Sequence, residues 1–282
     1  MQLYFDSLEL EIKPQNLILI FKFATIMMEE KTKIDVATVI KDMNRRATET
    51  PAFEAVLDAN VKSHHANIYR NHQSLWAIKK NMPLTKNDVV VEFGCGTGRL
   101  IFQLNNYCKQ IIGLDISDKM IDAANKLAKE KKTSNVQFIH SAEKIPLADN
   151  SVDKIYVCWV FSLMPDMAIH QALKEFERIL KPNGGAYIFD HTSNSGKETG
   201  NLQVHRKPEH LQEVLASSNL KIAKNKKVIR HPSRGMSIWT KINNSNFTFI
   251  LPLLQMLDDQ LVLRKPEFID YYTEFFELKK LS

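Results

Sequence analysis

The sequence predicts an α/β fold: a doubly wound, mostly parallel seven-stranded sheet with an antiparallel C-terminal hairpin and helical additions at both ends. First, short runs rich in β-branched residues alternate with helical stretches between residues 88 and 190. Such alternation implies crossover connections and a parallel sheet covered on both faces. Second, the first run leads directly into a glycine-rich turn, "GCGTG". Third, a chain of 282 residues, 44% of them hydrophobic, can bury a large core.

The alternating segment supplies the expected parallel strands and the helices between them. Ser117 suits the N-cap of the second helix because its hydroxyl can accept a hydrogen bond from the first turn. Pro182 is expected to end the third helix, since proline cannot continue one. The expected strands are 89–93, 110–116, 135–140, 152–160 and 184–191, and the expected helices are 98–108, 117–132 and 166–181.

The pattern changes after residue 191. A polar loop at 192–201 and a helix at 211–219 are expected to precede two strands, 220–230 and 235–242. The turn "HPSR" would join these strands as the antiparallel hairpin. The expected organisation is an N-terminal extension of open role (1–50), a helical cap (51–87), the core (88–242) and a helical C-terminal extension (243–282) with two helices separated by Pro266.

The apolar segment 16–28 needs a separate interpretation. It is interrupted by Lys22 and is shorter than the about 20 apolar residues that span a bilayer. It lacks the flanks of a signal peptide. A docking helix, an edge strand and a contact with a membrane surface all stay open. Met27 and Met28 also allow a later start of translation.

Charge and cysteine content exclude some classes of protein. The net charge of +6 gathers in clusters such as 129–132 and 224–227, which are typical of solvated helix ends and turns, with nucleic acid or an acidic membrane as the alternatives. Cys95, Cys108 and Cys158 show no paired spacing. This argues against a disulfide scaffold and against a metal site such as zinc, and indicates a reducing, cytoplasmic setting.

The glycine turn predicts a small-ligand site, because glycine permits positive φ and close approach of a ligand to backbone N–H groups. A dinucleotide site requires G-x-G-x-x-G, whereas Arg99 stands where the third glycine should be. The phosphate-binding loop also fails, because no G-K-[ST] follows the turn. The expected ligand is therefore one without phosphate.

Several motifs in order resemble the class I S-adenosylmethionine-dependent methyltransferases, particularly their small-molecule, ubiquinone-biosynthesis-like branch. The resemblance lies in "VVVEFGCGTGRL", "IIGLDISDKMIDAANKLA", "NVQFIHSAEKIPLADNSVDKIYVCWVFSLMPD" and "ALKEFERILKPNGGAYIFD". It covers about residues 85–191 and extends less firmly to 242. It implies a Rossmann-like sheet and S-adenosylmethionine as cofactor.

The resemblance also implies positions for the cofactor's parts. Glu92 would receive the ammonium, directly or through water, and the turn formed by Gly94, Cys95, Gly96 and Gly98 would pass close to the amino-acid tail. Asp115 would accept the ribose hydroxyls, with a helix N-cap or simple turn residue as the alternative role.

Around the adenine end of the cofactor, this sequence departs in part from the family's pattern. Ile116 would flank the adenine, and Met120 would do so or belong to the core. The family's Gly-Asp-Ala-Glu is "HSAE" here, so adenine recognition passes to Ser141, to Glu143 or to the backbone of Ala142. The last two predicted cofactor residues, beside the methyl group, are Cys158 and Trp159.

Methyl transfer from a sulfonium is an in-line displacement that depends mainly on positioning and on exclusion of water. His191 is the candidate general base for an acceptor that must lose a proton, with a structural turn histidine as the alternative; His205, His72 and Tyr69 are weaker candidates.

The acceptor is expected to be a small molecule, a lipid or a saccharide-linked group. "CWVF" replaces the N/D-P-P-Y/F tetrad of enzymes that methylate base amino groups, so nucleic acid is disfavoured. An RNA-modifying methyltransferase and a non-catalytic binding or regulatory protein remain the alternatives. Peripheral contact with a membrane stays open.

Overall fold

The structure, a computed structural model, describes residues 34–57, 64–141, 144–199, 202–242, 245–262 and 270–280. The apolar segment 16–28, Ala142, Glu143 and Pro266 lie outside the described residues. The helices are α2 (Val36–Glu49), α3 (Ala52–Ala55), α4 (His64–Asn81), α5 (Ile101–Leu104), α6 (Asp118–Lys131), α7 (Asp166–Ile179), α8 (Pro208–Ala216), α9 (Arg234–Ile242) and α10 (Leu251–Val262), with the 3-10 turns η1 (Asn105–Tyr107), η2 (Phe161–Leu163) and η3 (Ser245–Ile250). The strands are β1 (Val89–Phe93), β2 (Gln110–Asp115), β3 (Val136–His140), β4 (Val152–Cys158), β5 (Leu180–Ser193), β6 (Lys197–Thr199), β7 (Gln203–His205), β8 (Lys221–His231) and β9 (Tyr271–Lys279).

Seven strands form one sheet in the order β3-β2-β1-β4-β5-β9-β8. The five strands from β1 to β5 pair in parallel, and β9 pairs antiparallel with both β5 and β8. The predicted fold class is confirmed: a mostly parallel, doubly wound sheet ending in an antiparallel pair. Strands β6 and β7 form a separate two-stranded ribbon.

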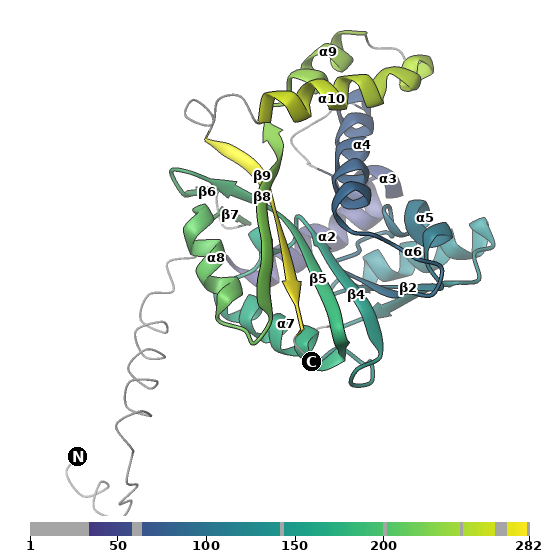
Figure 1. Ribbon diagram of the computed structural model, residues 1–282. Helices are drawn as coiled ribbons and strands as arrows, with labels where there is room; N and C mark the ends of the chain where they lie inside the picture. Colours follow the sequence, from purple (N-terminus) through teal and green to yellow (C-terminus); the bar gives the residue numbers. More distant parts are fainter. Residues whose placement is uncertain are drawn as a thin grey trace, which may run out of the picture. The chain divides into compact units, whose positions relative to one another are not determined.

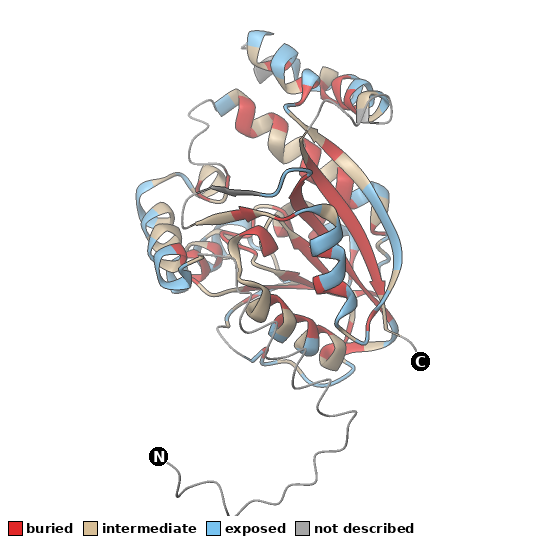
Figure 2. Ribbon diagram, turned by 90° about the vertical axis from the view of Figure 1, so that its left-hand side faces the viewer, coloured by how far each residue is buried: buried red, intermediate tan, exposed pale blue. Residues whose placement is uncertain are grey.

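Helices cover both faces of the sheet (Figure 1). One core cluster joins the sheet to α7 and α8 and includes Phe176 and Leu215. The other joins the opposite face to α4, α5 and α6 and includes Ile78 and Ile101. The inner strands are buried along most of their length (Figure 2), which is why β1 is an uninterrupted apolar run apart from Glu92.

The predicted N-cap of α6 is confirmed, whereas two elements are shorter than predicted. Ser117 caps α6, because its Oγ accepts a hydrogen bond from the backbone N–H of Met120 at 3.1 Å. The helix after the glycine turn is shorter than expected: α5 covers only Ile101–Leu104 and continues as η1. Likewise, β4 ends at Cys158, before the backbone turns at Trp159.

Pro182 does not end α7. The helix stops at Ile179, and Leu180 already pairs with Val152 in the sheet. The pairing between β4 and β5 then resumes at Lys154 and Gly185. Pro182 lies in this irregular stretch of β5, where the missing N–H costs no regular ladder hydrogen bond.

The expected hairpin is wrong in its second strand. Residues 235–242 form helix α9, whose Trp239 is buried. The true partner of β8 is β9, in the segment 271–279 that was expected to be helical. β9 is buried on both faces, and its aromatic and β-branched residues favour a strand. The loop expected at 192–201 is also partly regular, because β5 extends to Ser193 and β6 follows.

Candidate functional site

A cavity of about 400 Å³ opens at the carboxyl ends of β1, β2 and β4. Ligands of parallel α/β sheets bind at this edge. Nine of the predicted cofactor residues line it: Glu92, Gly94, Cys95, Gly96, Asp115, Ile116, Ser141, Cys158 and Trp159. Gly98 and His191 are not among the lining residues, and Ala142 and Glu143 lie outside the described part of the chain.

The glycine turn has a conformation that other residues adopt only with strain. Gly94 and Gly96 have φ of 74° and 52°. A Cβ on Gly94 would lie 2.4 Å from Val160, and one on Gly96 would lie 2.1 Å from Val56. Their backbone therefore forms part of the cavity wall, as expected for a turn that a ligand approaches closely. Gly98, with φ of 78°, faces the ring of Phe138 instead, so its space serves packing.

Asp115 closes the turn from the end of β2. Its Oδ2 accepts a hydrogen bond from Gly96 N at 2.7 Å, and its Oδ1 accepts one from Ser117 N at 2.9 Å. Burial raises the pKa of Asp115, and these two backbone donors oppose the rise. Each carboxylate oxygen keeps a further acceptor position, so the side chain can also accept hydroxyl groups of a ligand in the cavity.

Glu92 is the most deeply buried acid of the cavity, with 3% of its surface exposed. The hydroxyl of Tyr156 donates to its Oε2 at 2.8 Å. Burial raises the pKa of Glu92 to about 8, against the lowering effects of Tyr156 and the Arg99 guanidinium. A cation bound beside Glu92 would lower this pKa and ionise the carboxyl group.

Trp159 has a left-handed backbone, with φ of 61°. This region is rare for a bulky side chain, and such residues concentrate at functional sites. The surroundings hold it in place: Trp159 N donates to Phe189 O at 2.8 Å, and Nε1 donates to Thr273 Oγ1 at 3.0 Å. Trp159 is one of the residues that line the cavity.

His191 packs against the indole of Trp159 and does not line the cavity. The two rings stack with centroids 5.1 Å apart. His191 is 8% exposed and also contacts the rings of His205, His231 and Tyr271. Burial lowers the pKa of His191 well below its ordinary value, so the imidazole is neutral. Its role as a general base stays a prediction, and the weaker candidates Tyr69, His72 and His205 do not line the cavity either.

One wall of the cavity was not predicted. Helix α2 contributes an apolar stripe, and the adjacent Val56 extends it. The helix is attached to α6 through the Ser117 hydroxyl, which donates to Asn44 Oδ1 at 2.5 Å. The spacing of the stripe is i, i+3, i+4, i+7, which is the amphipathic signal that could have revealed it. Its members are Val36, Val39, Ile40 and Met43.

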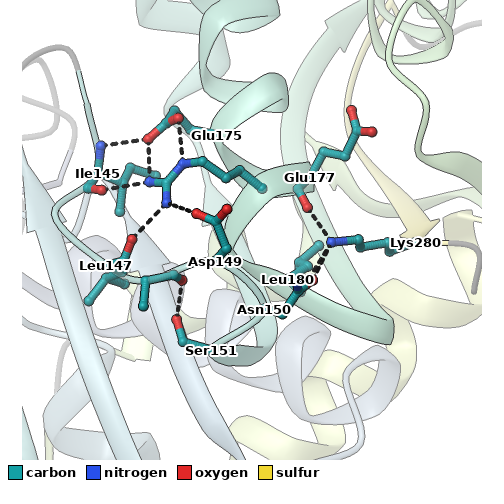
Figure 3. Close-up of polar contacts among 11 residues, drawn as sticks. Ile145, Leu147, Asp149, Asn150, Ser151, Glu175, Glu177, Leu180 and Lys280 are labelled. Atoms are coloured by element: carbon teal, nitrogen blue, oxygen red, sulfur yellow. Dashed lines mark hydrogen bonds and ion pairs between the residues drawn. The ribbon is translucent and has the colours of Figure 1, made fainter.

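The opposite wall comes from η2, α7 and the loop after β3. Arg178 of α7 holds this loop: its guanidinium donates to Ile145 O and Leu147 O, both at 2.8 Å. Glu175 accepts from Arg178 and from Ile145 N (Figure 3). Arg178 thus positions Ile145 without lining the cavity itself. The remaining lining residues on this side include Leu163, Met164, Ala168, Gln171 and Ala172.

Comparisons with known proteins agree with this geometry. Residues 90–184 match the family described as methyltransferase domain. The chain is 26% identical over 166 residues to "Uncharacterized methyltransferase YcgJ" of Bacillus subtilis (strain 168), which covers 55% of this chain and 65% of that protein. It is 32% identical over 113 residues to the demethylmenaquinone methyltransferase of Staphylococcus aureus (strain Newman), covering 38% of this chain and 44% of that protein. The chain therefore spans less than two thirds of each of these relatives.

The fold also matches solved structures. The crystal structure of geranyl diphosphate C-methyltransferase from Streptomyces coelicolor A3(2), in complex with Mg2+, geranyl diphosphate and S-adenosyl-L-homocysteine, aligns with a TM-score of 0.60. The alignment covers 86% of this chain and 98% of that one at 13% identity. Among the described residues, no helix combines the length and apolar character needed to cross a bilayer.

Proposed function

We propose that this chain, which carries a class I methyltransferase domain, transfers a methyl group from S-adenosylmethionine to a small-molecule, lipid or saccharide-linked acceptor. The observation that carries the proposal is the cavity at the carboxyl ends of β1, β2 and β4. It brings together a buried carboxyl group, a glycine turn and a second carboxylate, which suit the ammonium, the amino-acid tail and the ribose of the cofactor.

The residues fit the cofactor chemically. Glu92 would hold the ammonium and Asp115 the ribose hydroxyls. The glycine turn would let the amino-acid tail approach the backbone closely; its N–H groups at Gly94, Cys95, Gly96 and Gly98 donate within the protein. Ile116, Met120 and Ser141 line the same cavity and would contact the adenine. When bound, S-adenosylmethionine supplies an electrophilic methyl group on its sulfonium.

The protein's contribution is positioning in a site that excludes water. Trp159 and the apolar stripe of α2 would shield the reacting atoms. The titratable side chains among the described cavity residues are Glu92, Cys95, Arg99, Asp115, Cys158 and Glu175, with no histidine among them. Burial raises the pKa of Cys158 to about 12. Of the carboxyl groups, Glu92 and Asp115 are assigned to the cofactor, and Glu175 pairs with Arg178. We therefore expect an acceptor atom that reacts without a side-chain base, such as a neutral amine or a thiolate.

A small acceptor is also supported by the names of similar proteins, which include a demethylmenaquinone methyltransferase and a geranyl diphosphate C-methyltransferase. An RNA-modifying enzyme would need its basic clusters on one face. Here the cluster at 129–132 is at the end of α6, beside β3, whereas the cluster at 224–227 lies on β8, at the other edge of the sheet. Two basic clusters at opposite edges of the sheet do not form one continuous binding path for the phosphate backbone of an RNA.

The test is calorimetric titration of S-adenosylmethionine and, separately, S-adenosylhomocysteine into the wild type, Asp115→Ala and the control Asp118→Ala. Asp118 is an exposed acid in the first turn of α6, only three positions away. We expect micromolar-range binding that Asp115→Ala weakens at least about tenfold, because a charged acceptor is lost, and that the control preserves. Thermal unfolding of each variant verifies that it is folded.

Absence of binding to a folded wild type, with or without candidate acceptors present, would refute catalysis and favour the regulatory alternative. If binding holds, labelled methyl donor identifies the acceptor. We also propose a cytoplasmic location, supported by the three free cysteines, Cys95, Cys108 and Cys158.

A further inference from the structure

Exposed apolar side chains gather on one part of the molecule. Of the nine large hydrophobic residues that are exposed in the described chain, seven lie on α9, η3 and α10. Phe249 is 72% exposed and Leu253 is 67% exposed. Single exposed hydrophobics are ordinary, but a group of them marks an interaction site. We call this group the apolar face; its members are Ile238, Ile242, Phe247, Phe249, Leu253, Met256 and Leu257.

The apolar face belongs to firmly anchored helices. In α10, Leu251, Leu254 and Asp258 are buried, whereas Leu253, Met256 and Leu257 are exposed. These two sets follow the i, i+3, i+4 and i+7 spacing of two separate helix faces. One face of α10 therefore packs on the protein, and the other has no described partner in this chain. Both helices lie at one end of α4 and β8 (Figure 1).

The charges around the apolar face have one sign. The segments 234–242 and 245–262 contain two exposed cations, Arg234 and Lys241. Their two acids are engaged elsewhere: Asp258 is buried, and Asp259 pairs with the amino group of Lys80 at 2.6 Å.

More cations border the same face. Met256 shares a surface depression with Lys226 and Lys227, and with the ion pair of Lys80 and Asp259. An apolar surface bordered by lysine and arginine is complementary to a lipid bilayer that carries anionic headgroups.

The apolar face also lies on the side of the sheet where the cavity opens. β8 ends at His231 and α9 begins at Arg234; the chain enters β9 at Tyr271, which pairs with both His231 and Ser193, the last residue of β5. The parallel strands β4 and β5 end at this edge, and Trp159 of the cavity follows β4 directly.

From these observations we propose that the apolar face docks on an anionic lipid bilayer. Phe249 and Leu253 enter the boundary between headgroups and acyl chains, while Arg234 and Lys241 contact the anionic headgroups. The cavity would then open toward the membrane surface, where an amphipathic acceptor resides. The docking itself does not depend on the proposed methyl transfer, and its test measures binding alone.

The test is flotation of the full chain with vesicles of phosphatidylcholine, and with vesicles of phosphatidylcholine mixed with phosphatidylserine. We expect binding to the mixed vesicles and weaker binding to the neutral ones. The double variant Phe249→Gln/Leu253→Gln should lose at least about tenfold in partitioning. The double variant Arg234→Gln/Lys241→Gln should lose about fivefold in partitioning for each charge removed, and only on the mixed vesicles.

A matched control removes two exposed lysines of α6, Lys126→Gln/Lys129→Gln, and should bind like the wild type. Analytical ultracentrifugation reports the oligomeric state of each variant without lipid. If the wild type binds neither kind of vesicle, or if Phe249→Gln/Leu253→Gln binds as well as the wild type, the proposal is wrong. A wild-type dimer that this variant converts to a monomer, without vesicle binding, would instead assign the apolar face to a second copy of the chain.

Discussion

At the scale of single residues, two carboxyl groups of the cavity show how differently burial is compensated. Asp115 accepts two hydrogen bonds from backbone N–H groups, whereas Glu92 accepts one from the Tyr156 hydroxyl. Burial raises the pKa of both groups, and that of Glu92 to about 8. Near neutral pH, Glu92 thus holds a proton that a bound ammonium would displace, so binding of the cofactor should release protons.

The raised pKa of Glu92 predicts a pH-dependent stability. Between its ordinary value of 4.5 and about 8, the folded chain holds the Glu92 proton more tightly than the unfolded chain does. The wild type therefore loses stability as pH rises through this window. We expect Glu92→Gln to exceed the wild type above pH 8 by on the order of a few kcal/mol in the free energy of unfolding, and to match it below pH 4.5.

Urea denaturation at a series of pH values measures this difference. The control, Glu130→Gln, changes an exposed glutamate of α6 and should leave the pH dependence unchanged. Parallel curves for the wild type and Glu92→Gln across the window would contradict the prediction.

At the scale of elements, one buried carboxylate joins α4, α9 and α10. Asp258 accepts hydrogen bonds from the Tyr69 hydroxyl at 2.8 Å, from Gln73 Nε2 at 3.3 Å and from Gly235 N at 2.9 Å. The Ser233 hydroxyl donates to it as well. A Cβ at Gly235 would lie 2.0 Å from the Tyr69 oxygen, so glycine is required where α9 begins. This network keeps the two helices attached while their outer face stays apolar.

Removing this carboxylate should detach the helices. Asp258→Ala leaves several buried donors without an acceptor, and we expect a loss of roughly 3 kcal/mol in the free energy of unfolding. The control is Asp122→Ala: Asp122 is an exposed acid of α6 whose carboxylate pairs only loosely with Lys119, at 3.7 Å, so its removal should cost about 1 kcal/mol or less. Hydrogen exchange of α9 and α10 amides locates the effect. Equal losses for the two variants would show that the network does not anchor these helices.

At the scale of the whole molecule, the last described strand is an inner one. β9 lies between β5 and β8 and is antiparallel to both, so the sheet is complete only when residues 271–279 are in place. The excursion through α9 and α10 therefore lies between two paired strands of the sheet. Residues near the C-terminus belong to the core, contrary to their expected place in a helical extension.

Two phenylalanines distinguish the structural role of the sheet from that of the segment that contains η3, α9 and α10. Phe275 of β9 is 0% exposed, whereas Phe249 before α10 is 72% exposed. We expect Phe275→Ala to cost about 3–5 kcal/mol in the free energy of unfolding, because it leaves a cavity in the core. Phe249→Ala should change it by less than about 0.5 kcal/mol. Chemical denaturation measures both, and a large loss for Phe249→Ala would mean that this side chain is structural.

The sequence by itself determined the parallel part of the sheet, the cap of α6 and the glycine turn, because each depends on residues close together in the chain. Periodicity marks the strands, Ser117 caps the helix that it precedes, and Gly94 and Gly96 adopt positive φ within one turn. Nine of the predicted cofactor residues consequently meet at one cavity, although their contacts with the cofactor remain a prediction.

Only the tertiary structure decided the features that depend on distant partners. Residues 235–242 are helical where Trp239 packs and donates to His65 O at 2.8 Å, and β9 is a strand because β5 and β8 pair with it on both sides. Helix α2 lines the cavity from far outside the motif region, and His191 stacks on Trp159 without lining the cavity itself. Short apolar segments suit a helix or a strand equally well by pattern, so the choice follows from burial against residues far away in the chain.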